Sequence, residues 1–151
     1  MEQINLPAHG EENGAMHSRM IAVSDQQDGR TNVRAWIRTN ERGKAIFAAA
    51  YSTHTSHRET YMNIALPLPF GNTTGVLTLN HDKGNGLTLS SLPCGGDEGI
   101  YFHTKRFTVR LPLQEHFHVW KNDDAGLHAV HTMWLFRKKF LSITYHIHRR
   151  Q

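Results

Sequence analysis

Apolar and polar residues alternate along most of this chain. In "NVRAWIRT", residues 32–39, three apolar residues alternate with Arg34, Trp36 and Arg38. Successive side chains of a β-strand point to opposite faces, so this alternation predicts a strand. The alanine-rich "AIFAAAYSTHT" at 45–55 is the one plausible helix. Its second half favours a strand, however, and we expect a strand there too.

Turn residues divide the chain at the spacing of an all-β domain. The clearest hairpin pairs Leu77 and Leu79 with Leu87 and Leu89 across a Gly- and Asn-containing turn at 82–86. No stretch resembles the helix of a βαβ unit. We therefore predict an all-β fold, an antiparallel meander β-barrel of about 8–10 strands. A closed barrel of about eight strands leaves room for side chains or one small ligand.

The length of 151 residues suits one domain, which we place at 16–151 after a flexible arm at 1–15. Hydrophobic residues make up 38% and charged residues 20%, as in a soluble globular protein. No window approaches the roughly 18 apolar residues of a membrane-spanning helix. Residues 1–16 lack a basic start followed by an apolar stretch, so we expect no signal peptide and a cytoplasmic location. The lone Cys94 fits a reducing compartment.

The charge of the chain is mildly basic and scattered. Lys and Arg outnumber Asp and Glu by 17 to 13, and basic residues cluster only at 137–139 and 148–150. Nucleic-acid binding favours a concentrated basic patch, so we expect no nucleic-acid partner. Twelve histidines are the unusual feature, because they change the surface charge as the pH falls below 7.

Three stretches have the look of a known group of domains. They are "NIALPLPFGNTTGVLTL" at 63–79, "RLPLQEHFHVW" at 110–120 and "HTMWLFRKKFLSITYHI" at 131–147. Together they resemble segments of uncharacterised bacterial lipocalin-like domains. The resemblance implies a barrel that holds an apolar ligand, and no functional residue is carried over from it.

The pair of histidines in "EHFHVW" could hold a metal ion. His116 and His118 lie two residues apart and so share one face of a strand, as a zinc site would need. Glu115 falls on the other face and cannot easily join them. If Phe117 and Val119 face the core, both histidines face outward. We favour this exterior interpretation and expect no cofactor and no metal, with a metal site at His116 and His118 as the alternative.

The predicted function is non-enzymatic binding of a hydrophobic or amphipathic small molecule in the barrel cavity. We expect no stable membrane insertion. The first alternative is a barrel enzyme in which His103 or His131 is the base and a tyrosine its partner. The second is a module that forms a homodimer through an exposed β-edge or the histidine-bearing face. The predicted ligand-binding residues are Trp36, Phe47, Tyr51, Tyr61, Phe102, Phe107, Trp134 and Tyr145.

Overall fold

The computed structural model describes residues 17–28, 30, 32–82, 84, 86–121 and 126–147, with only the backbone of residues 27 and 28. The arm expected at 1–15 lies outside these residues. The elements are β1 (His17–Ala22), α1 (Asp25–Asp28), β2 (Arg34–Thr39), β3 (Ala45–Ser56), β4 (Glu59–Leu68), β5 (Gly71–His81), β6 (Leu87–Ser90), β7 (Gly99–His103), β8 (Thr108–Arg110), β9 (Leu113–Lys121), β10 (Leu127–Leu135) and β11 (Lys138–Ile147).

The strands form one antiparallel sheet, which confirms the predicted all-β class. Along the sheet the order is β1-β2-β3-β4-β5-β6-β9-β10-β11, so most neighbours in sequence are neighbours in space. Strand β5 has two partners on one side. Its second half pairs with β6 and its first half pairs with β7, to which β8 is added. The chain thus leaves the meander after β6, builds the β7–β8 hairpin, and returns at β9.

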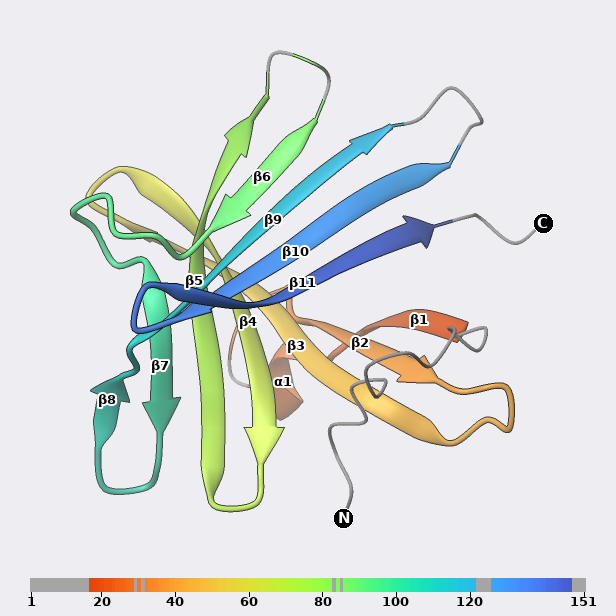
Figure 1. The fold of residues 1–151 in the computed structure, drawn as a ribbon. Helices are drawn as coiled ribbons and strands as arrows, with labels where there is room; N and C mark the ends of the chain where they lie inside the picture. The colour runs from red at the N-terminus through yellow and green to blue at the C-terminus, as the bar shows by residue number, and fades with distance from the viewer. Residues whose placement is uncertain are drawn as a thin grey trace.

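The sheet curls into a half-barrel, which is consistent with a meander barrel (Figure 1). Its two ends approach each other through side chains. Arg38 of β2 lies with its guanidinium carbon 5.0 Å from the ring centroid of Tyr145 in β11. No pairing joins β1 to β11 among the described strands. The face that carries Arg38 and Tyr145 is therefore the concave face.

Two local predictions can be followed directly in the pairing. The alanine-rich stretch is strand β3, because its backbone pairs with β2 on one side and β4 on the other. The β5–β6 hairpin is present, with Leu79 opposite Leu89, but Leu87 lies opposite His81. Antiparallel pairing of all four leucines would place Leu79 opposite Leu87 and Leu77 opposite Leu89, so the observed register is shifted by two residues and forms only one leucine pair.

A small apolar core lies on the concave face. Ala49, Ile64 and Leu77 are buried in β3, β4 and β5. Partly buried side chains pack against them: Phe47, Tyr51, Met62, Leu66, Leu89 and Phe117. The apolar core of the sheet therefore lies on the concave side of β3, β4 and β5.

On the opposite, convex face, the segment 91–98 is built around a buried carboxylate. Glu98 is 1% exposed, and its Oε1 accepts the backbone N–H groups of Cys94, Gly95 (2.8 Å) and Gly96 (3.1 Å). Burial acts to raise the pKa of Glu98, but these donors outweigh it and the pKa is lowered. This network fixes the segment that leads into β7.

Candidate functional site

An arginine surrounded by aromatic rings lies on the concave face. The Arg38 guanidinium carbon is 4.0 Å from the Trp36 ring centroid, 5.4 Å from that of Phe47 and 5.0 Å from that of Tyr145. The Trp36 ring in turn lies 5.6 Å from the ring of Tyr51. We call Trp36, Arg38, Phe47, Tyr51 and Tyr145 the Arg38 cluster.

Strand geometry explains why these side chains converge. Trp36 and Arg38 lie two residues apart in β2 and share a face. Phe47 is the register partner of Arg38, and its ring meets Trp36 edge-on at 5.8 Å. Tyr145 comes from β11, which the curl of the sheet brings across the concave face.

The charge of Arg38 is half-buried and has no carboxylate partner among the described residues. The ion pairs there join histidines to acids, and none includes Arg38. Cation–π contacts compensate only part of the lost hydration of a guanidinium. Burial raises the pKa of Tyr51 above its usual range, while the nearby Arg38 acts in the opposite direction. The cluster therefore offers a positive charge on an apolar surface, without a direct carboxylate partner among the described residues.

Beside this cluster, a histidine and a glutamate are buried together. His131 Nε2 lies 3.3 Å from Glu115 Oε2, and their side chains are only 13% and 12% exposed. The imidazole stacks on Phe117 with ring centroids 3.8 Å apart. The geometry of this contact is not that of a hydrogen bond, and the buried Nε2 of His131 has no hydrogen-bond partner among the described residues. An imidazole next to a carboxylate can nevertheless exchange a proton with a bound molecule.

The structure brings together four of the eight predicted lining residues, namely Trp36, Phe47, Tyr51 and Tyr145. Phe102 shares their face, since its register partner Thr73 is on the same side of β5 as the buried Leu77.

The other three predicted lining residues lie elsewhere. Tyr61 is buried on the convex face, where it stacks on His54 under segment 91–98. Trp134 pairs with Gln114 in β9, next to Glu115, and so also points to the convex face. Phe107 is 57% exposed at the tip of the β7–β8 hairpin. None of these three side chains therefore lies on the concave face with the other predicted lining residues.

The two alternative catalytic histidines are far apart in the fold. His131 is the buried residue described above. His103 ends β7, and its Nδ1 is 2.9 Å from Thr108 Oγ1 at the hairpin tip. Its ring lies 6.3 Å from that of Tyr101, without a carboxylate partner among the described residues. Of the two, only His131 combines burial with a neighbouring acid.

The alternative metal ligands His116 and His118 lie on the convex face, as their register with Thr132 and Val130 of β10 requires. His118 Nε2 is 2.9 Å from Asp82 Oδ2. Burial, and secondarily the neighbouring His118, lower the pKa of His116. Among the described residues, no group of three or more His, Cys, Asp or Glu is arranged to hold a metal ion.

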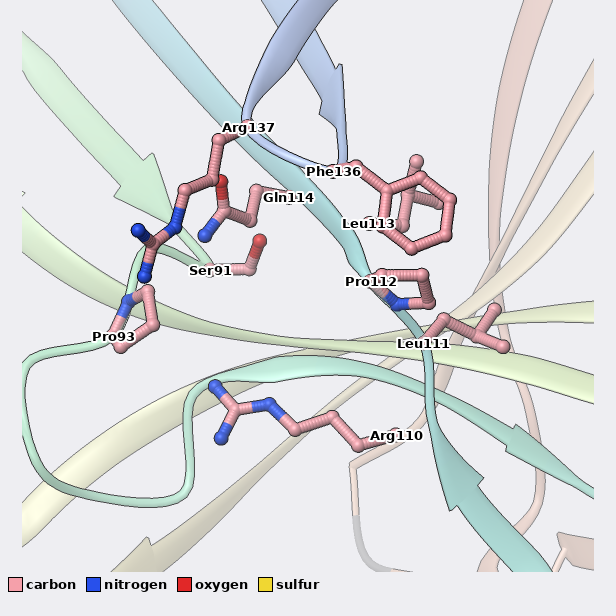
Figure 2. A pocket seen from close by; sticks show the side chains of 9 residues that line it. All are labelled: Ser91, Pro93, Arg110, Leu111, Pro112, Leu113, Gln114, Phe136 and Arg137. Atoms are coloured by element: carbon pink, nitrogen blue, oxygen red, sulfur yellow. The ribbon is translucent and has the colours of Figure 1, made fainter.

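A separate pocket of about 370 Å³ opens where β9 begins (Figure 2). Two arginines reach toward it from different elements. Arg110 donates from Nη2 to the Glu98 carbonyl at 2.7 Å, and Arg137 belongs to the β10–β11 turn. Phe136, Pro112 and other apolar side chains form its rim. This pocket shares no residue with the Arg38 cluster.

Sequence reasoning did not include Arg38, Glu115 or Glu98 in a site. For the first two a signal was present. The alternation that places Trp36 on a face places Arg38 there, and the one that turns Phe117 inward turns Glu115 inward. Charged residues are mostly exposed in proteins, however, so alternation alone does not select these two for a buried site. For Glu98 no local pattern was informative, since its burial depends on the backbone of segment 91–98.

Comparisons with known proteins give one informative match. No protein-family model matches the chain, and no solved structure matches it. None of the described helices is long and apolar enough to cross a membrane. The chain is 48% identical over 135 residues to the "Uncharacterized membrane protein YndJ" of Bacillus subtilis (strain 168). The match covers 87% of this chain and 24% of that protein, so the chain is similar to one segment of a much longer relative.

Proposed function

We propose that the concave face binds a hydrophobic or amphipathic small molecule without converting it, and that Arg38 holds an anionic head group. The observation that carries this proposal is the half-buried guanidinium of Arg38 among aromatic rings, without a carboxylate partner among the described residues. The apolar core of the concave face would accommodate the rest of the ligand. A lipocalin-like mode of binding is in keeping with this arrangement.

Two fluorescent probes test the proposal by separating charge from hydrophobicity. Anilinonaphthalene sulfonate is an aromatic anion, and phenylnaphthylamine is a neutral molecule of similar shape. We expect Arg38→Gln to weaken binding of the anionic probe about tenfold or more, because a hydrogen bond to a charged group contributes about that much to affinity. Binding of the neutral probe should be nearly unchanged.

Arg42→Gln is the matched control, because Arg42 lies in the exposed turn of the same β2–β3 hairpin. It should bind both probes like the wild type. If Arg38→Gln and Arg42→Gln weaken the anionic probe equally, general surface charge explains binding and the proposal fails.

A second candidate is an enzyme that uses His131 as a general base. The buried contact between His131 and Glu115 favours it. Turnover of an amphipathic ester, para-nitrophenyl octanoate, would support it if His131→Gln abolished the reaction and His128→Gln did not. His128 is a suitable control, since its ring lies against Trp120 and His146, away from Glu115. Equal rates in both variants would count against the enzyme.

The relative is named a membrane protein, so we propose that this domain is a water-exposed segment of such a protein, on the cytoplasmic side. The exposed Cys94 gives a test. In intact cells from which any outer barrier has been removed, an impermeant maleimide should label Cys94 only after lysis. Labelling before lysis would place the domain on the outside.

A further inference from the structure

Two exposed phenylalanines project from neighbouring turns at one end of the molecule. Phe70 is 89% exposed in the two-residue turn between β4 and β5, and Phe107 is 57% exposed at the tip of the β7–β8 hairpin. Figure 1 shows both turns at the bottom of the view. The pairing of Asn72 with His103 confirms that they are side by side. We call the residues 69–72 and 103–107 the tip surface.

The backbone holds these turns in fixed positions. Thr104 organises the hairpin tip, because its Oγ1 accepts the N–H of Phe107 at 3.1 Å and its own N–H donates to the Phe107 carbonyl at 2.9 Å. The two turns also touch, since a Cβ added to Gly71 would collide with the carbonyl oxygen of His103. The two aromatic side chains are thus presented on a pre-formed surface.

The charge of the tip surface is entirely basic. Lys105 and Arg106 lie next to Phe107, and residues of both turns line a hollow of about 690 Å³. The nine residues that line it include no Asp or Glu. Exposed aromatic rings flanked by Lys and Arg are the combination that binds the interface of an anionic bilayer, with apolar groups inserted and cations at the head groups.

We propose that the tip surface docks reversibly on an anionic lipid bilayer, with Phe70 and Phe107 inserted and Lys105 and Arg106 at the phosphates. This surface is separate from the Arg38 cluster, so it goes beyond the proposed ligand binding. The β10–β11 turn also combines Phe136 with basic residues. It fits the role less well, because it is a single turn with one exposed phenylalanine, whereas the tip surface presents two from adjacent turns.

Vesicle co-sedimentation of the full chain tests the proposal. The probes are vesicles of phosphatidylcholine alone and of equal parts phosphatidylcholine and phosphatidylglycerol. We expect binding mainly to the anionic vesicles, decreasing with salt. Phe70→Ser with Phe107→Ser should weaken it by at least about tenfold. Lys105→Gln with Arg106→Gln should weaken it about fivefold per residue and remove most of the salt dependence.

The matched control is Phe136→Ser with Phe140→Ser, since these phenylalanines are 72% and 55% exposed and also flank basic residues. It should bind vesicles like the wild type. The proposal would be overturned if this control lost vesicle binding while the Phe70 and Phe107 variant retained it. Equal binding of the wild type to both kinds of vesicle would also overturn it. So would a wild-type dimer that becomes monomeric in the Phe70 and Phe107 variant, because a second copy would then cover this surface.

Discussion

Replacement of Glu98 by glutamine should destabilise the protein more than the same replacement of an exposed glutamate. The carboxylate is 1% exposed and accepts three backbone N–H groups. Glutamine has nearly the same shape, so it leaves no cavity, but it removes the charge. Hydrogen bonds to a charged group contribute about 1.5–3 kcal/mol and neutral ones about 0.5–1.5 kcal/mol. With roughly 1 kcal/mol lost per bond, we expect Glu98→Gln to cost about 2–4 kcal/mol.

The assay is urea denaturation of the wild type, Glu98→Gln and a control, Glu59→Gln. Glu59 is exposed at the start of β4, so the control should stay within about 0.5 kcal/mol of the wild type. For Glu98→Gln the midpoint should fall by about 1–2 M urea at neutral pH, with an unchanged slope.

The pH dependence provides the refuting result. The pKa of Glu98 is lowered in the folded state, so the folded protein binds fewer protons than the unfolded chain. The carboxylate therefore stabilises the fold above its unfolded pKa of about 4.3, and this contribution is lost as the pH falls through the folded pKa. The difference between wild type and Glu98→Gln should shrink below about pH 4.3. Equal midpoints at neutral pH, or a difference that persists in acid, would refute the reasoning.

Three further substitutions have clear expected outcomes. Gly75→Ala should cost about 1–3 kcal/mol by urea denaturation, because its Cβ would collide with Glu115 Oε1, and the cost should fall in a Glu115→Asp background. Tyr51→Phe should leave the phenolate absorbance change near pH 10 unaltered, because burial raises the pKa of Tyr51 above that range; a lost tyrosine signal would contradict this. His116 has a lowered folded pKa, so protonation destabilises the fold as the pH falls through about 6.5, and His116→Gln should reduce the midpoint decrease in mild acid; an unchanged decrease would contradict it.

The fold class could be predicted because alternation is a local property. Residues 32–39 show it and include the whole of β2, whereas the strand at 45–55, which forms most of β3, is expected from the strand-favouring residues of its second half. The detour through β7 and β8 was not predictable in the same way. Strand β5 pairs with β6 along one half and with β7 along the other, and this choice depends on tertiary contacts.

The candidate site was only partly predictable, because alternation does not reveal which face of a strand is concave. Neighbouring residues of a strand point to opposite faces, and Trp134 and Tyr61 lie on the convex face and not on the concave one. The proximity of Tyr145 and Arg38 depends on the curl of the sheet, which brings together elements more than a hundred residues apart in sequence.

Native mass spectrometry tests the central claim, that Arg38 on the concave face holds the head group of an amphipathic ligand. The chain would be purified without a His-tag or metal resin, together with Arg38→Gln and Arg42→Gln. We predict that the wild type and Arg42→Gln retain an added mass that tandem fragmentation identifies as an anionic amphiphile, and that Arg38→Gln retains little of it. A wild-type protein without added mass, or an adduct that persists equally in Arg38→Gln, would contradict the claim.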